Sequence, residues 1–168
     1  MTDGRTCCGG QQAAEESPTY ETVRIERTQN TCPMCEDYAR HQASKPVVVM
    51  CCEGACLRGE IARQGANILC HRLAPEKTAR LCLGGAFTKD TSQRGLARNG
   101  TRVIAVEGCF LECASRMMKG VIPDLRPEVI IADTLYEFDR TLFGIDEMPE
   151  GEIRTHGKEV AERIAERI

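Results

Sequence analysis

Short runs of apolar, largely β-branched residues, each followed by a segment with helical periodicity, constrain the fold of this chain more than any other feature. The clearest runs are residues 46–50 (PVVVM) and residues 101–108 (TRVIAVEG). A continuous apolar run of this length is typical of a strand that is buried on both faces. Two further strands are predicted within residues 79–87 and 126–135. Because strands that alternate with helices form mostly parallel sheets, we predict a single three-layer α/β domain in which helices cover both faces of the sheet.

The predicted helices lie between these strands and at the end of the chain. Leu57, Ile61 and Ile68 recur at helical spacing, which predicts a helix over residues 57–73. A capped short helix is predicted within residues 88–100, closed by Asn99 and Gly100. The remaining helices are expected over residues 109–120 and 157–168, and the last of these places Val160, Ile164 and Ile168 on one side.

The 168 residues of the chain are enough for one well-buried core. We expect a polar and largely flexible N-terminal tail over residues 1–30, a cysteine-rich α/β domain over residues 31–150 and a C-terminal amphipathic helix over residues 151–168. Residues 19–28 contain a pattern compatible with a short strand. Residues 30–45 are predicted to form a Cys-x-x-Cys turn that leads into a short helix.

The charge pattern excludes several classes of partner. The formal net charge is −3 with both signs mixed along the chain, so no basic stripe indicates binding to nucleic acid. No apolar stretch approaches the roughly 18 residues that a membrane span requires. The first residues, MTDGRTCCGGQQAAEES, lack the apolar centre of a secretory signal. We therefore expect a cytoplasmic protein with neither a nucleic-acid nor a membrane partner.

Cysteine is the unusual part of the composition. The chain has eleven cysteines, at positions 7, 8, 32, 35, 51, 52, 56, 70, 82, 109 and 113. A secreted chain with this count would suggest a disulfide framework. In the reducing cytosol the same count favours metal or thiol chemistry instead.

Several of these cysteines directly follow predicted strands. Ligands of parallel α/β sheets bind beyond the carboxyl ends of the strands, where Cys51, Cys52, Cys82 and Cys109 are expected. Cys113 lies four residues after Cys109, so the two side chains can converge on one side of the next helix. Thiols at the ends of adjacent strands, roughly 4.8 Å apart, are close enough to share one tetrahedral zinc ion.

Three segments of the chain resemble the DGC-domain family, small prokaryotic proteins that are described as zinc-binding. The segments are CEGACLRGEIA (52–62), CLGG (82–85) and EGCFLECA (107–114), and the resemblance covers about residues 46–135 in the right order. It implies four metal ligands, which correspond here to Cys52, Cys82, Cys109 and Cys113. The resemblance implies no established reaction.

The chain departs from the pattern of this family at four positions. Glu107 stands where the family has its name-giving Asp, and Glu53 stands in place of Ser. Cys51 and Cys56 are additional thiols beside the first implied ligand. They leave room for a second metal, for an iron–sulfur cluster, or for thiols that accept sulfur or selenium.

Three functions therefore stay open at the level of the sequence. The first is a zinc-binding protein with a Cys₄ site, in a metal-dependent or metal-handling role. The second is an enzyme of sulfur or selenium transfer or thiol redox chemistry that uses a persulfide or a [4Fe–4S] cluster and accepts a small-molecule or sulfur-containing ligand. The third is a structural domain whose thiols are incidental. The secondary ligand candidates are Cys32, Cys35, Cys51 and Cys56, and no catalytic residue, reaction or oligomeric state follows from the pattern.

Other residues have simpler interpretations. Gly84 and Gly85 are expected to form a tight turn near the metal. Glu53 and Glu107 are a possible pair of carboxylates at the site. Cys70 is expected in the core, whereas the histidines, including His156, lie in polar stretches and are expected at the surface.

Overall fold

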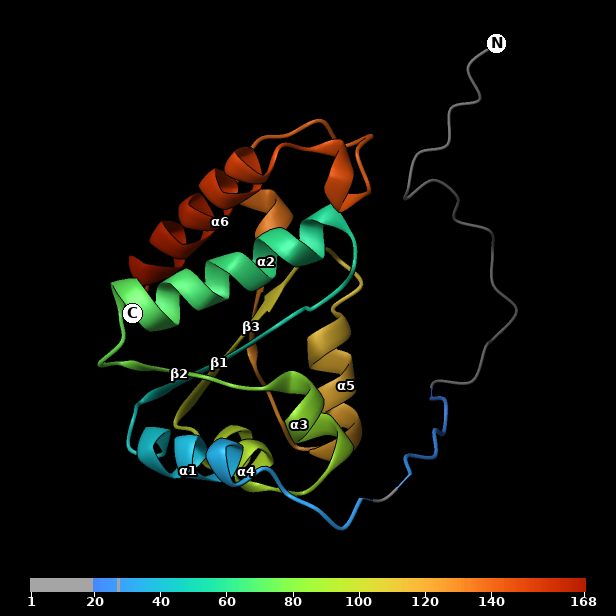
Figure 1. Ribbon diagram of the computed structural model, residues 1–168, viewed down its shortest axis with the longest axis vertical. Helices are drawn as coiled ribbons and strands as arrows, with labels where there is room; N and C mark the ends of the chain where they lie inside the picture. The colour runs from blue at the N-terminus through green and yellow to red at the C-terminus, as the bar shows by residue number, and fades with distance from the viewer. Residues whose placement is uncertain (1–19, 27) are drawn as a thin grey trace.

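A four-stranded parallel sheet forms the centre of the computed structural model, which describes residues 20–26 and 28–168 (Figure 1). Its strands are β1 (Val47–Cys51), β2 (Thr78–Arg80), β3 (Arg102–Glu107) and β4 (Glu128–Ile131). They lie in the order β2-β1-β3-β4, and every neighbouring pair is parallel. The predicted α/β class and parallel sheet are confirmed.

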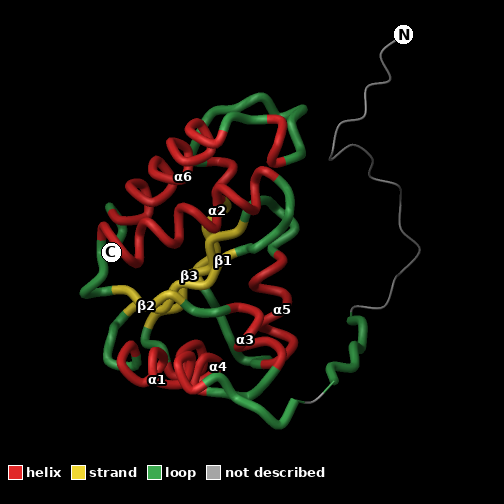
Figure 2. Tube along the Cα trace, in the orientation of Figure 1, coloured by secondary structure: helices red, strands yellow, loops and turns green. Residues whose placement is uncertain are grey.

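Helices cover both faces of this sheet, which gives the three predicted layers (Figure 2). One face carries α2 (Leu57–Ile68), extended by a π-helical turn (Leu69–Leu73), and α6 (Glu150–Ala165), which packs along α2. The other face carries four shorter helices: α1 (Pro33–Gln42), α3 (Leu83–Thr88), α4 (Ser92–Asn99) and α5 (Cys113–Val121).

The two faces have separate apolar cores because side chains alternate along each strand. In β1, Val47, Val49 and Cys51 join the core under α2 and α6. Val48 and Met50 join the core under the four shorter helices. All five β1 residues are buried, as expected for a strand between two helical layers.

The C-terminal helix begins at Glu150, close to the predicted boundary at residue 151 and earlier than the periodic segment 157–168. Its predicted apolar face is confirmed, since Val160 and Ile164 are fully buried and Ile168 packs against the same core. No helix in the described part of the chain is long and apolar enough to cross a membrane.

Some local predictions were wrong. Residues 20–26 and 28 contain no strand, and the rest of the tail predicted over residues 1–30, including Cys7 and Cys8, lies largely outside the described residues. Gly84 and Gly85 lie inside the short helix α3 and do not form the tight turn that was expected. The helix expected over residues 109–120 begins at Cys113, because residues 109–112 form a turn that ends with Glu112 at a φ of 49°. The turn over residues 109–112 depends on tertiary contacts, so the local sequence did not predict it.

Candidate thiol and metal site

The predicted ligands follow three neighbouring strands at one edge of the sheet. Cys52 comes directly after β1, Cys82 follows β2 after one residue, and Cys109 follows β3 after Gly108. Because β1 pairs with both β2 and β3 in parallel, these three positions lie at the carboxyl edge. Cys113 is the first residue of α5. The expected placement of cysteines at the carboxyl ends of strands therefore holds in the structure.

Four thiols lie near one another where the loops after β1 and β3 meet. The sulfurs of Cys52 and Cys56 flank Gly54, at 3.5 Å and 3.7 Å from the position that a Cβ on Gly54 would occupy. Cys113 acts electrostatically on Cys52, and both Cys56 and Cys113 act on Cys109. We call Cys52, Cys56, Cys109 and Cys113 the β1–β3 thiol group. Cys56 was only a secondary candidate in the sequence, and the fold brings it into this group.

Glycines bring the two loops together at the start of α2. A Cβ on Gly108 would lie 2.8 Å from the backbone nitrogen of Gly59 and 2.9 Å from the carbonyl carbon of Arg58. A Cβ on Gly59 would lie 2.8 Å from the carbonyl oxygen of Gly54. Neither position has room for a side chain, so the loops after β1 and β3 pack directly against the first turn of α2.

Burial sets the charge state of these thiols. It raises the pKa of Cys52, although the N–H groups of Gly54 and Gly108 act in the opposite direction. It also raises the pKa of Cys109, and the N–H of Leu111 partly offsets the effect. Both thiols therefore favour the protonated state at neutral pH unless a cation neutralises the negative charge of the thiolates.

Glu107 has a structural partner and does not form a carboxylate pair with Glu53. Its buried carboxylate accepts hydrogen bonds from the N–H of Ala114 (3.1 Å), the N–H of Ser115 (2.6 Å) and the hydroxyl of Ser115 (2.7 Å). It thus caps the N-terminus of α5 from the end of β3. Glu53 instead accepts a hydrogen bond from Arg80 at 2.8 Å. The two side chains have different partners, so the alternative of a carboxylate pair at the site was wrong.

Cys51 lies apart from the β1–β3 thiol group. It is fully buried in the core under α2 and α6, where burial raises its pKa to about 12. Arg80 donates a hydrogen bond to its sulfur at 2.7 Å and also donates to Glu53. Alternation along β1 directs Cys51 into the core, whereas Cys52 follows it into the loop.

A second set of thiols lies at the end of β2. Cys32 and Cys35 begin α1, and both Cys32 and Cys82 act electrostatically on Cys35. The buried side chain of Gln93 connects these segments, since its amide donates to the carbonyl oxygen of Cys35 (3.2 Å) and accepts from the N–H of Cys82 (3.1 Å). We call Cys32, Cys35 and Cys82 the β2 thiol group.

Sequence reasoning missed an ion pair beside the β1–β3 thiol group. Asp133, which follows β4, pairs with Arg58 at 3.3 Å, and both side chains are about nine-tenths buried. The negative charge of Asp133 also raises the pKa of Cys109. Asp133 lies at the same carboxyl edge as the cysteines, so extending the strand-end rule from Cys to Asp would have found it.

The core and surface assignments were partly correct. Cys70 is buried, as predicted. His156 was expected to be solvated, but its side chain is only 12% exposed and its ring lies 4.7 Å from that of Tyr136. The prediction relied on the polar sequence neighbours of His156 and did not consider that its side chain borders the buried side of α6.

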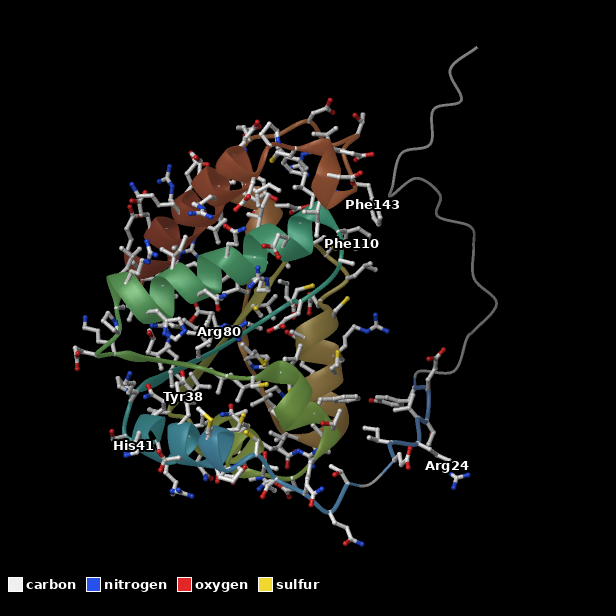
Figure 3. All side chains as sticks on the ribbon, viewed as in Figure 1. Arg24, Tyr38, His41, Arg80, Phe110 and Phe143 are labelled. Carbon is white, nitrogen blue, oxygen red and sulfur yellow. The ribbon has the colours of Figure 1, made fainter. Side chains whose placement is uncertain are left out.

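The view with side chains shows residues that surround the site (Figure 3). Phe110 and Phe143, which are exposed, lie near the N-terminal end of α2 in this view, and Arg80 is the last residue of the edge strand β2. Within residues 20–26 and 28–168, no three His, Cys, Asp or Glu side chains are arranged so that they could hold a metal ion. The structure thus gives two sets of neighbouring thiols without a closed coordination sphere.

Comparison with known proteins gives one match. The family model for the DGC domain matches residues 48–160, which include all but the first residue of β1, the strands β2 to β4 and most of α6. No curated protein and no solved structure matches the chain. The matched region contains both α2 and the complete β1–β3 thiol group, whereas Cys32 and Cys35 precede it.

Proposed function

Because this chain belongs to the DGC-domain family, we propose that it is a metal-binding protein that holds zinc through Cys52, Cys82, Cys109 and Cys113. One observation carries the proposal. Cys52 is far along the chain from Cys109 and Cys113, yet the three lie near one another at the edge where parallel sheets bind ligands. Cys82 follows the next strand of the same edge.

The chemistry of the donors fits zinc. Thiolates are preferred ligands of Zn²⁺ and of iron–sulfur clusters. Burial keeps Cys52 and Cys109 protonated, so metal binding there must release protons and must be weaker at low pH. The two loops also depend on each other through Gly59 and Gly108, so a metal bound between them would stabilise both. The side chains of the cysteine ligands must rotate for their sulfurs to surround one zinc ion.

Two cysteines are candidates for the fourth zinc ligand. The resemblance to the family supports Cys82, whereas proximity supports Cys56, which acts electrostatically on Cys109. Cys82 is instead tied through Gln93 to Cys35. We expect Cys82→Ser to lower the zinc content of the purified protein and Cys56→Ser to leave it unchanged. The opposite result would assign Cys56 as the fourth ligand.

Metal analysis of anaerobically purified protein tests the proposal directly. We expect about one zinc per chain and no visible colour, and we expect Cys109→Ser to lose the metal. Cys70→Ala provides the matched control, because Cys70 is a thiol in the core outside both thiol groups. Zinc content that is unchanged in Cys109→Ser would refute the proposed site.

A second candidate is an enzyme of sulfur or selenium transfer, or of thiol redox chemistry, that uses an iron–sulfur cluster or a persulfide. The observation that favours it is Cys56, a thiol of the β1–β3 group beyond the Cys₄ set. Three thiols could hold a [4Fe–4S] cluster while the fourth contacts the substrate. Brown protein that contains iron and absorbs at about 400 nm would favour this candidate over zinc.

We further propose that the protein works in the cytoplasm. The chain builds two apolar cores and so does not need a disulfide framework, and its eleven cysteines fit a reducing compartment. Fractionation of cells that express the full chain, with thiol labelling before lysis, tests this placement.

A further inference from the structure

The segment before the family match contains a thiol pair of its own. Cys32 is the N-cap of α1, Pro33 occupies the first turn, and Cys35 follows within that turn (CPMC). Cys32 is exposed and Cys35 is half-buried. Hydrogen bonds from the N–H and the thiol of Cys35, and from the N–H of Met34, lower the pKa of Cys32. Cys35 donates its thiol proton to Cys32, and loss of that proton would break the hydrogen bond, so the pKa of Cys35 is raised.

Tertiary contacts hold this pair in place. Gln93, which is 3% exposed, donates to the carbonyl oxygen of Cys35. The carboxylate of Glu36 accepts hydrogen bonds from the N–H of Ser92 (3.2 Å) and from its hydroxyl (2.6 Å). Both contacts join the first turn of α1 to α4, so the thiol pair has a fixed position on the domain although it precedes the first strand.

A pocket opens beside the half-buried member of the pair. Its volume is about 460 Å³, and its lining includes Cys35, Cys82, Tyr38, Arg63 and Arg80. Tyr38 and Arg80 reach it from α1 and β2 (Figure 3). A space of this size accommodates a small molecule and is too small for a folded partner. The two guanidinium groups are already paired, Arg80 with Glu53 and Arg63 with Glu60, so the thiols of the lining are what favours a small sulfur-containing ligand.

We propose that Cys32 and Cys35 form a thiol–disulfide exchange pair that reduces small-molecule disulfides, an activity separate from metal binding. Cys32 is the attacking residue because it is exposed, and Cys35 is the resolving residue because it is its hydrogen-bonded neighbour. The activity uses a segment outside the region that matches the family, so it goes beyond the proposed metal site.

The reaction balances without a further cofactor. The Cys32 thiolate attacks one sulfur of the external disulfide, forms a mixed disulfide and releases the first external thiolate, which takes up a proton. Cys35 then loses its proton to solvent and attacks the sulfur of Cys32. The Cys32–Cys35 disulfide forms, and the second external thiolate leaves and is protonated. Two thiols of the chain are oxidised, and one disulfide is reduced to two thiols. Excess external thiol reverses both steps.

Trypsin makes the pair easy to follow. Cleavage after Arg27 and Arg40 releases the peptide 28–40 (TQNTCPMCEDYAR), which contains Cys32 and Cys35 and no other cysteine. Cleavage after Arg80 and Lys89 places Cys82 in the separate peptide 81–89.

Full-length protein is equilibrated anaerobically with mixtures of reduced and oxidised glutathione and quenched with acid. Remaining thiols are alkylated under denaturing conditions before digestion and mass spectrometry.

We expect peptide 28–40 to convert to its internal disulfide as the proportion of oxidised glutathione rises. Cys35→Ser should trap Cys32 as a mixed disulfide with glutathione, because the resolving thiol is missing. Cys32→Ser should slow the reaction of this peptide by about tenfold or more, since Cys35 is half-buried. Both substitutions lie outside the strands, and circular dichroism verifies that the variants are folded.

Cys109→Ser separates this activity from zinc binding. It removes a proposed zinc ligand and should leave the exchange of peptide 28–40 unchanged, so either proposal can fail without the other. The exchange pair is refuted if peptide 28–40 stays fully alkylated across the glutathione series. A disulfide that joins peptides 28–40 and 81–89 would also refute it, because Cys82 would then be the partner of Cys32 or Cys35.

Discussion

Individual buried polar groups have the clearest roles in this protein. Glu107 is 1% exposed and satisfies three hydrogen-bond donors at the start of α5, two of them backbone N–H groups. A carboxylate that accepts backbone N–H groups at a helix N-terminus also interacts favourably with the helix dipole. In this chain, the acidic position of the family motif therefore positions the helix that begins with Cys113.

Removing the Glu107 carboxylate should therefore be costly. We expect Glu107→Ala to lower the free energy of unfolding by about 3 kcal/mol, because it leaves buried donors without an acceptor. Denaturant unfolding measures the change. The control is Glu128→Ala, which breaks a partly exposed ion pair with Arg102 and should cost less than about 1 kcal/mol. Equal losses in the two variants would contradict the capping role.

The buried thiol of Cys70 should make the free energy of unfolding decrease with pH in the alkaline range. Burial raises its pKa, so between the ordinary thiol pKa of about 8.5 and the raised value the folded state binds more protons than the unfolded state. The contribution of the Cys70 thiol to the free energy of unfolding is complete below pH 8.5. It decreases as the pH rises above this value, by up to about 1.4 kcal/mol per pH unit. Denaturant unfolding of the wild type and of Cys70→Val from pH 8 to 10.5 should show a shallower decline in the variant. Parallel curves would show that Cys70 does not contribute.

At the scale of secondary-structure elements, the site depends on how closely α2 approaches the two loops. Gly54, Gly59 and Gly108 meet at distances that allow no side chain between them. The loop after β1 also pairs with a distant segment, since the N–H of Leu57 donates to the carbonyl oxygen of Phe143 and Cys56 forms a β-bridge with Gly144. The thiols after β1 and β3 therefore depend on α2 for their relative position.

Gly108→Ala tests this dependence without removing a thiol. The added methyl group would lie 2.8–2.9 Å from the backbone of Arg58 and Gly59, so the loop after β3 must shift. We expect a loss of about 1–3 kcal/mol in unfolding free energy and a lower zinc content per chain. Gly120→Ala in α5 meets nothing within 4 Å and should retain zinc while gaining up to about 1 kcal/mol. A Gly108→Ala variant with full zinc content would argue against close packing at this point.

At the scale of the whole molecule, two apolar cores stabilise the fold without a metal. The core under α2 and α6 and the core under the four shorter helices lie on opposite faces of one sheet. Zinc fingers, in contrast, lack such cores and unfold without their metal. The proposed zinc should therefore add to the stability of a protein that folds on its own.

Removal of zinc by a chelator should lower the melting temperature without unfolding the protein at room temperature. A ligand present at about a hundred times its Kd stabilises the native state by about 2.7 kcal/mol. For a chain of this size, that change corresponds to about 5–10 °C. Thermal denaturation with and without chelator measures the shift, and Cys109→Ser serves as the variant without a shift. A wild type that does not respond to the chelator would indicate that no metal had been bound.

The sequence by itself determined the class of the fold and the edge of the sheet where the thiols lie. Runs such as residues 46–50 encode buried strands locally, and parallel strands bring their carboxyl ends to one edge whatever the details of the loops. The motifs at residues 52–62, 82–85 and 107–114 were also sufficient to identify the family, which the match over residues 48–160 supports.

Only the tertiary structure decided which side chains are partners at that edge. It brought Cys56 into the β1–β3 thiol group, tied Cys82 to Cys35 through Gln93, directed Cys51 into the core and paired Asp133 with Arg58. These contacts join residues that are distant along the chain, and they depend on loop paths set by close backbone packing. Periodicity and motif spacing describe only neighbours in the sequence, so they carry no information about such contacts.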